Sequence, residues 1–170
     1  MLKRTEAPAL NMIPDQTLQS EANVNQQRNE HRTPIFEFLY RMVQNAAVAE
    51  VLAIKAFARL DRGNRGGERV SLTGLFRIAA DLALEEPRGR REIRQLPPAD
   101  EPSGVGPAVA SIPARQRAAM LMHKYHRMNS KQIASVLNCP EAVAQSLLLS
   151  AYDSLRRQLI RHEDCTVESA

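Results

Sequence analysis

The fold of this protein is decided by residues 112–159, "IPARQRAAMLMHKYHRMNSKQIASVLNCPEAVAQSLLLSAYDSLRRQL". Apolar residues recur there with the period of a helix in three segments, which two short breaks separate. Asn138 can adopt the left-handed conformation that ends a helix, and Pro140 suits the first turn of the next one. Three helices with a turn of three or four residues between the last two predict a helix-turn-helix.

The same pattern predicts where these helices begin and what they bury. Ile112-Pro113 starts the first helix, and Asn129 or Ser130 can cap the second. The residues expected to face the core are Ala118, Leu121, Met122, Tyr125, Ile133, Ala134, Leu137, Ala144, Leu147, Leu148, Ala151 and Leu155.

The third helix has an unusual charge pattern. In a helix-turn-helix this element lies in a major groove of DNA, yet no Lys or Arg occurs from Glu141 to Leu155. The segment from Pro113 to Arg161 still has eight Lys or Arg against Glu141 and Asp153, a net charge of +6. We therefore expect nonspecific attraction to phosphates and weak reading of base sequence. The eight cations are Arg115, Arg117, Lys124, Arg127, Lys131, Arg156, Arg157 and Arg161.

The preceding block, from residue 33 to about 91, predicts three more helices. Thr33-Pro34 fits a cap followed by proline at a first helical position, and Gln44-Asn45 marks a kink or short turn. The third helix begins near Leu72 and ends before Pro87. The expected core residues are Ile35, Phe38, Leu39, Met42, Val43, Ala46, Ala49, Leu52, Ala53, Ala56, Phe57, Leu60, Leu75, Phe76, Ala79, Leu82 and Ala83.

The second of these helices is apolar on more than its core stripe. Val51, Ile54 and Ala58 surround Lys55 on its other side, which is more apolar than a solvated helix face needs to be. These residues either form a surface for a partner protein or are buried against their own domain.

Composition predicts an all-α protein of two small helical domains joined by a linker rich in Pro and Gly. The expected boundaries are a disordered N-terminal tail at 1–32, a first domain at 33–95, the linker at 96–112, the helix-turn-helix domain at 113–161 and a C-terminal tail at 162–170. A length of 170 residues with 44% apolar content is enough for these modest cores and makes a large enzyme unlikely.

Charge and apolar content also limit the environment. The chain has 23 Lys and Arg against 19 Asp and Glu, a net charge of +4. This balance fits either an acidic partner such as nucleic acid or a mildly basic solvated surface. Neither a signal-peptide core nor an apolar run of membrane-spanning length occurs, so a soluble, cytoplasmic protein without membrane contact is expected. Two cysteines predict reduced thiols.

Several His and Cys residues have spacings that are compatible with a metal site. His123 and His126 lie three residues apart on a helix, Cys139 follows in the turn, and His162 and Cys165 repeat a histidine–cysteine spacing. Four such side chains can bind zinc. We instead expect a small buried cysteine and solvated imidazoles, with no metal and no cofactor.

Three stretches resemble regions 2 and 4 of extracytoplasmic-function sigma factors, which belong to the sigma-70 family. They are "FLYRMVQNAAVAEVLAIKAFARLDR", "GLFRIAADLALEEPRGRR" and the run from "IPARQR" to "SLRRQL", and they cover about two thirds of the chain. The resemblance implies a DNA-binding subunit of RNA polymerase with no catalytic residue. Region 2 would bind the clamp of the β′ subunit and open the −10 promoter element. Region 4 would bind the β flap and place its third helix in the −35 element.

The resemblance assigns residues to three surfaces. The polymerase-binding residues would be Glu50, Val51, Ile54, Lys55 and Ala58. Those on the −10 side would be Arg62, Asn64, Arg65, Arg69, Arg77, Arg88, Arg90 and Arg91, although the arginines after Pro87 also fit a solvated helix end. Those on the −35 side would be Lys131, Gln132, Gln145, Ser146, Leu149, Ser150, Arg156 and Arg157.

The chain departs from the family pattern at all three surfaces. Val51, Ile54 and Lys55 replace an acidic residue, an amide and a second acidic residue of the polymerase-binding helix. Gly74 stands where the family has tryptophan, and the chain has no Trp at all. In the third helix, Gln145 and Ser150 occupy positions where the family usually has Lys and Arg.

Two functions of different classes therefore follow. The first is a working sigma factor that binds core RNA polymerase and promoter DNA to direct transcription initiation, with unusual promoter specificity. The second is a sigma-like regulatory protein that binds an anti-sigma factor or another regulator and does not recognise promoters. Neither function is enzymatic.

Overall fold

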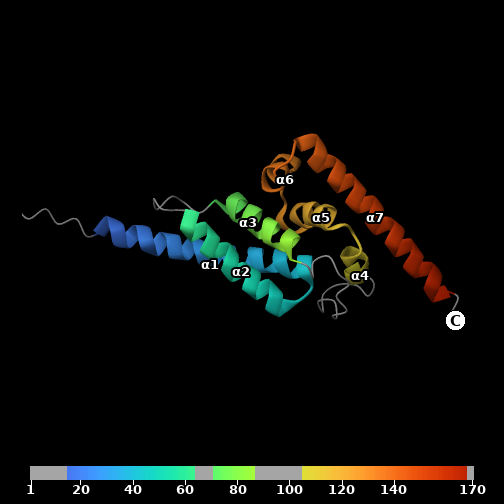
Figure 1. The fold of residues 1–170 in the computed structure, drawn as a ribbon, viewed down its shortest axis with the longest axis horizontal. Coiled ribbons are helices and arrows are strands. Elements are labelled where there is room, and N and C mark those ends of the chain that lie inside the picture. The colour runs from blue at the N-terminus through green and yellow to red at the C-terminus, as the bar shows by residue number, and fades with distance from the viewer. Residues whose placement is uncertain (1–14, 64–70, 87–104, 168–170) are drawn as a thin grey trace, which may run out of the picture.

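The computed structural model describes residues 15–63, 71–86 and 105–167, and all the regular structure in these ranges is helical (Figure 1). The expectation of an all-α protein is therefore confirmed. The helices are α1 (Asp15–Val43), α2 (Ala46–Gly63), α3 (Leu72–Glu85), α4 (Val105–Ala110), α5 (Ala114–His126), α6 (Ser130–Val136) and α7 (Glu141–Val167).

Helices α1, α2 and α3 pack around one another and form the first half of the core. The chain turns between α1 and α2 at Gln44, whose φ of 49° is left-handed, and the Asn45 side chain then accepts a hydrogen bond from Val48 N at 3.0 Å. Ser71 caps α3 through its hydroxyl. Ile35, Phe38, Leu52 and the other residues expected in this core are buried or half-buried; Ala46, which is exposed, is the exception, because it begins α2 at the turn.

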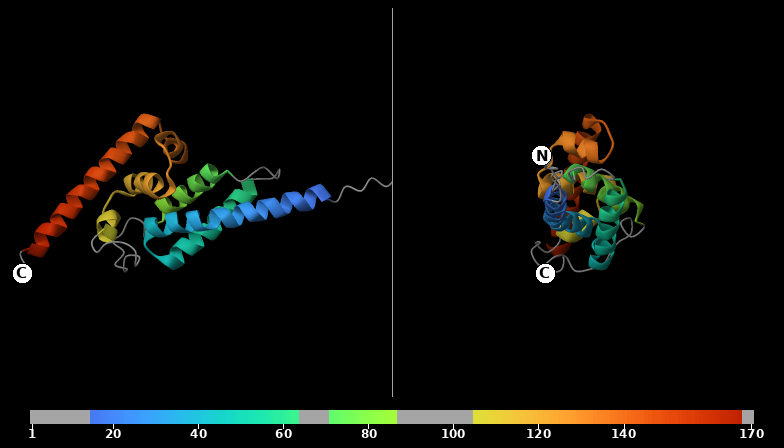
Figure 2. Two further views of the ribbon diagram at one scale, coloured as in Figure 1. Left: turned by 180° about the vertical axis from the view of Figure 1, so that it is seen from behind. Right: turned by 90° about the vertical axis from the view of Figure 1, so that its left-hand side faces the viewer.

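Helix α5 is the centre of the second half. It packs against α6 and α7 on one side and against α1 and α3 on the other. For this reason Arg117–Met122 are all buried, where the apolar period predicted a single buried stripe. Helix α7 runs from α6 past α5 and α4 (Figures 1 and 2).

The two halves share one continuous core. The ring of His126 in α5 lies 4.7 Å from the ring of Phe76 in α3 and 6.1 Å from that of Phe38 in α1, measured between centroids. Beside this cluster, the Arg41 guanidinium of α1 stacks over the Tyr125 ring of α5 at 3.9 Å. An imidazole, two phenyl rings and a cation–π pair therefore join the halves.

The start of α1 differs from the sequence-based expectation. The helix begins at Asp15, so Pro34 lies inside it and residues 15–32, expected in a disordered tail, are helical. The prediction of a helix beginning at Thr33-Pro34 was wrong because residues 15–32 are polar and show no apolar period. Residues 1–14 of the expected tail lie outside the described ranges.

The linker and the C-terminal tail also have boundaries that differ from those expected. Residues 105–112 belong to the expected linker, yet 105–110 form α4, and Ala108, Val109 and Ile112 are buried. The Gln44 side chain donates a hydrogen bond to the Gly106 carbonyl at 3.0 Å, which ties this segment to the end of α1. Helix α7 continues to Val167, beyond the expected tail boundary at 161. The remaining linker residues 96–104 are not described.

We expect His126 to make the stability of the protein depend on pH. Burial, and to a smaller extent Arg41, lowers the pKa of His126 from 6.5 to about 4. Between pH 6.5 and 4 the unfolded chain therefore binds more protons, so stability is complete above this window and falls as the pH is lowered through it. His126→Leu should make this decrease in the free energy of unfolding smaller by about 1 to 2 kcal/mol. The effect is no larger because the ring is partly exposed to solvent. Urea unfolding across the pH range measures the free energy of unfolding of both proteins.

His123→Leu is the matched control because His123 lies on the same helix and is exposed. This variant should retain the pH dependence of the wild type. An unchanged slope in His126→Leu would contradict the proposed burial of a neutral imidazole.

Candidate nucleic-acid interface and partner surface

The turn of the helix-turn-helix is held by local hydrogen bonds. Asn129 caps α6 by accepting from Gln132 N at 2.9 Å, and Gln132 Oε1 accepts from Asn129 N at 3.0 Å, which completes a capping box. The Ser130 hydroxyl donates to Glu141 Oε1 at 2.7 Å and links the first turns of α6 and α7. Gln132, a predicted DNA-binding residue, therefore already uses its carbonyl oxygen within the protein.

The link from α6 to α7 is fixed by a side chain of α5. Asn138 adopts the expected left-handed conformation with a φ of 48°. Arg115 Nη2 donates to the carbonyl of Leu137 at 2.8 Å, and Cys139 N donates to the carbonyl of Ala134 at 3.0 Å. Arg115 was expected only as one of several cations; its role in orienting α7 depends on a contact across 22 residues, which spacing does not reveal.

The outer face of α7 is open to solvent. Gln145 and Ser146 are exposed, Ser150 is half-buried, and Leu149 has 73% of its surface accessible. Ala144 and Ala151 turn inward and are fully buried. The predicted −35 residues on this helix thus lie together on its outer face.

Cations lie at the ends of this face, and none occurs from Glu141 to Leu155. Lys131 is exposed at the start of α6, and Arg156 and Arg157 are exposed farther along α7. Arg157 pairs with Asp153 at 3.0 Å, and such an exposed pair constrains the arginine little.

Arg117 differs from the other cations of this segment because it is buried. Its Nη1 donates to the Ala110 carbonyl at 2.7 Å, and burial lowers the pKa of its guanidinium. The count of eight basic residues therefore overstates the charge that faces solvent, since Arg117 supports the α4–α5 junction.

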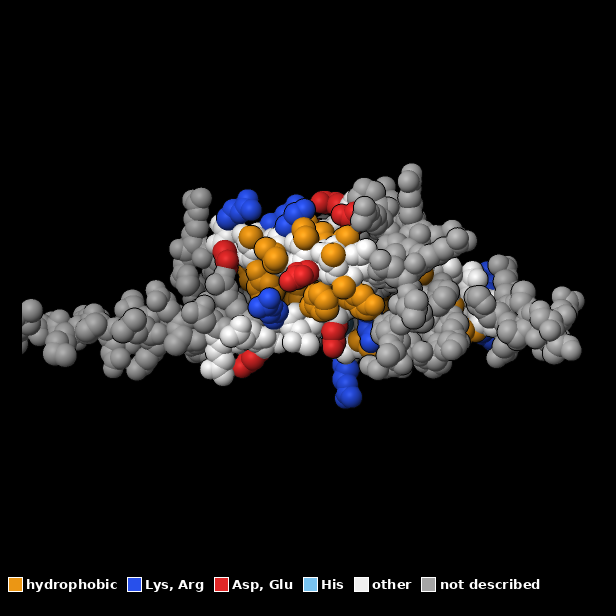
Figure 3. Space-filling model, turned by 90° about the horizontal axis from the view of Figure 1, so that it is seen from below, with side chains coloured by type: hydrophobic (Ala, Val, Ile, Leu, Met, Phe, Trp, Pro, Cys, Tyr) orange, Lys and Arg blue, Asp and Glu red, His pale blue; other side chains and the backbone are white. Residues whose placement is uncertain are grey.

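On α2, the residues assigned to polymerase binding share one exposed face. Ile54 and Val51 have 61% and 49% of their surfaces accessible, Glu50 and Lys55 are exposed, and Ala58 is half-buried. Figure 3, seen from the side on which α2 lies in Figure 1, shows apolar side chains with single acidic and basic ones among them.

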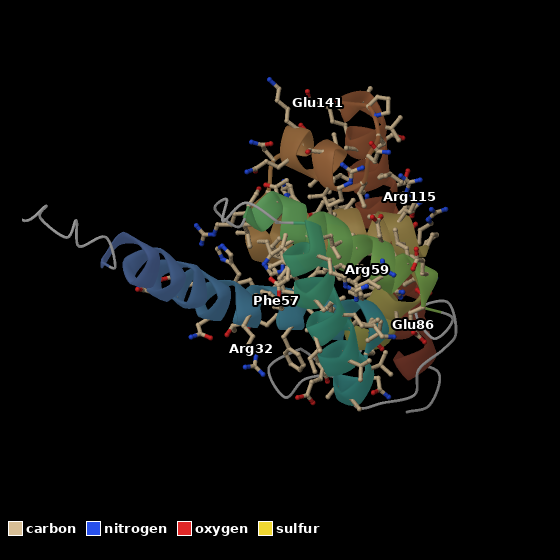
Figure 4. All side chains as sticks on the ribbon, turned by 60° about the vertical axis from the view of Figure 1, so that its left-hand side comes forward. Arg32, Phe57, Arg59, Glu86, Arg115 and Glu141 are labelled. Carbon is tan, nitrogen blue, oxygen red and sulfur yellow. The ribbon has the colours of Figure 1, made fainter. Side chains whose placement is uncertain are left out.

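A groove runs between this face and α1. Its floor is apolar through Phe36, Ala53 and Phe57, and Arg32 and Asp61 carry opposite charges on its wall. Arg32 of α1 and Phe57 of α2 lie on the same side of the molecule, whereas Glu141 lies at the start of α7 (Figure 4). Sequence reasoning missed the α1 side of this groove because it assigned residues up to 32 to a tail. The remaining lining residues are Asn29, Thr33, Glu50, Ile54 and Ala58.

The residues assigned to the −10 side are only partly described. Arg62 at the end of α2 and Arg77 on α3 are exposed. Gly74 has open space around it: a Cβ placed there would approach only Ser71, at 3.7 Å. Phe76 is fully buried and cannot stack on an unpaired base. Outside the described ranges lie Asn64, Arg65, Arg69, Arg88, Arg90 and Arg91.

The described residues do not gather the side chains that a metal site needs. Nowhere among these residues do three or more His, Cys, Asp or Glu side chains come close enough to hold a metal ion. Cys139 is a half-buried free thiol, and the side chains of His162 and Cys165 are not described. Within the same ranges no helix has both the length and the apolar content to span a membrane.

Comparison with known proteins identifies the second half of the chain. Residues 108–155, from α4 to the middle of α7, match the family described as Sigma-70, region 4. Curated protein sequences gave no match.

A solved structure is similar over most of the chain. It is the co-crystal structure of the sigma factor RpoE in complex with the anti-sigma factor NepR from Bartonella quintana. The TM-score is 0.68 at 16% identity, and the match covers 81% of this chain and 96% of that chain. At this identity the likeness shows a shared fold. The region 4 match confirms the resemblance to the sigma-70 family for residues 108–155, and the shared fold agrees with this resemblance over most of the chain.

We expect the same substitution to destabilise the protein at Arg117 and to leave its stability almost unchanged at Arg156. Arg117→Gln should lower the free energy of unfolding by about 1 to 3 kcal/mol, because it leaves the half-buried Ala110 carbonyl without its charged donor. Arg156→Gln should change it by less than about 0.5 kcal/mol, because Arg156 is exposed. Urea unfolding of both variants tests the assignment, and equal stabilities would contradict the structural role of Arg117.

Proposed function

We propose that this sigma-70 family protein directs transcription initiation by binding core RNA polymerase through α2 and promoter DNA through α7. The observation that carries the proposal is the open outer face of α7, which belongs to a helix-turn-helix within the matched region 4 and has exposed cations on both flanks. The two functional surfaces belong to different helices, so both partners can be engaged by one chain.

The α2 face has the properties of a docking surface. Ile54 and Val51 expose apolar area away from the core stripe, next to a groove with an apolar floor. Burial of Ile54 against a partner would contribute about 1.5 to 3 kcal/mol. This face is proposed to meet the β′ clamp, as the resemblance implies, while α5–α7 would meet the β flap.

Lys55 requires a particular partner surface. It is exposed within the α2 face, where the family has an acidic residue. A basic group opposite Lys55 would oppose binding by about 1 to 3 kcal/mol when desolvated. The polymerase that this protein serves should therefore present a neutral or acidic group there.

The DNA surface is proposed to gain its affinity from the flanks. Lys131 and Arg156 are exposed and can reach phosphates on either side of a groove that holds α7. Phosphate contacts of this kind make binding strongly dependent on salt.

A second function is favoured by one specific observation. Leu149 exposes 73% of its surface on a helix face that has no Lys or Arg from 141 to 155, which suits a protein partner. The structural relative is a sigma factor in complex with an anti-sigma factor. A sigma-like regulatory protein that binds an anti-sigma factor without recognising promoters is therefore the alternative. Co-elution with the protein's own core polymerase separates the two, since only the first function requires it.

We expect Ile54→Asp to abolish the complex with core polymerase while leaving the fold intact. Ile54 is 61% exposed, so a carboxylate there stays hydrated in the free protein but would be buried unpaired in the complex. Size-exclusion chromatography with core polymerase measures binding, and circular dichroism measures helix content.

Leu52→Asp is the control, because Leu52 is two residues away on the same helix and only 3% exposed. It should lower helix content and thermal stability sharply. Retention of polymerase binding by folded Ile54→Asp would refute α2 as the docking helix.

A further inference from the structure

We infer that the outer face of α7 selects A·T base pairs, with Gln145 contacting adenine and Leu149 contacting the thymine methyl group. The inference rests on the proposed binding of promoter DNA and specifies which base pairs that binding favours. Neither residue contacts the core, and both are free to meet a ligand.

The positions of these residues place them where a recognition helix reads bases. Ala142, Gln145, Ser146 and Leu149 recur at helical spacing along one side of α7 and are all exposed. They lie within the first nine residues of the helix, and in a helix-turn-helix the N-terminal part of this element contacts base edges.

The chemistry of this face favours one class of base pair. The glutamine amide can donate a hydrogen bond to adenine N7 while its carbonyl oxygen accepts one from adenine N6–H₂, and apolar side chains contact the thymine methyl group. Guanine is instead read by Arg or Lys at O6 and N7. No such side chain occurs from 141 to 155, and Arg156 follows Leu149 by seven residues, a rise of about 10 Å along the helix.

The surroundings of Leu149 favour DNA over a protein as the occupant. Gln145, Ser146 and Asp153 border Leu149, and its exposed neighbour three residues on, Tyr152, has its hydroxyl 3.5 Å from His123 Nδ1, so polar groups lie on most sides of Leu149. Glu141 is hydrogen-bonded to Ser130 and Asp153 is paired with Arg157, so both acids of the segment already have partners. The exposed cations Lys131 and Arg156 then leave the flanks attractive to phosphates.

The test uses the full chain and two duplexes of about two helical turns. Their ends are identical, and their central positions are all A·T in one and all G·C in the other. Fluorescence anisotropy at two salt concentrations should show roughly tenfold tighter binding of wild type to the A·T duplex. The double variant Gln145→Ala, Leu149→Ala should lose this preference while keeping its salt dependence, because no phosphate contact changes. Gln145→Arg should shift preference toward the G·C duplex.

Lys131→Gln is the matched control. It should weaken binding to both duplexes equally and reduce the salt slope by about one. Circular dichroism checks that each variant folds, which is expected because all three substituted side chains are exposed.

The outcomes separate this inference from the proposed function. Salt-dependent binding by wild type with no preference, or a preference that survives in the double variant, would overturn base reading by these residues and leave DNA binding intact. A lack of binding to either duplex at low salt would instead overturn the proposed DNA-binding function, and the inference with it.

Discussion

The packing of α5 is the constraint on which the rest of the structure depends. Six consecutive residues, Arg117–Met122, are buried because helices from both halves surround α5. A helix covered on so many sides has little surface left for a ligand. The contacts of His126 with Phe38 and Phe76 extend this packing across the junction, so the two halves form a single core.

The same packing determines where partners can bind. Because α5 holds the inner faces of α1, α3, α6 and α7, exposed apolar area remains on the outer sides of α2 and α7. On α2 this area adjoins a groove with charged walls, which suits another protein. On α7 it consists of Leu149 with Tyr152 three residues on, and polar side chains and cations surround it, which suits a nucleic acid. Different surroundings thus give two exposed apolar residues, Ile54 and Leu149, different proposed partners.

Basic residues illustrate how position changes the role of a charge. Arg115 and Arg117 lie two residues apart on α5, and each donates to a backbone carbonyl, of Leu137 and of Ala110. Arg115 thus holds the turn between α6 and α7 and Arg117 the junction of α4 and α5, whereas Lys131 and Arg156 extend into solvent. The net charge of the segment therefore divides into a structural part and a part available to phosphates.

The sequence by itself determined the features that depend on neighbouring residues. These include the helical periods of α2, α3 and α5, the cap at Asn129, and the left-handed turn at Asn138, because their hydrogen bonds form within a few residues. The outward positions of Ile54 and Leu149 followed from the same periods. Only the tertiary structure decided the burial of Arg117, the helix at 105–110 and the contact of His126 with Phe76, since these depend on packing between segments far apart in the chain. The helix at residues 15–32 was missed for a related reason: an apolar period reveals a helix only where the helix packs against a core.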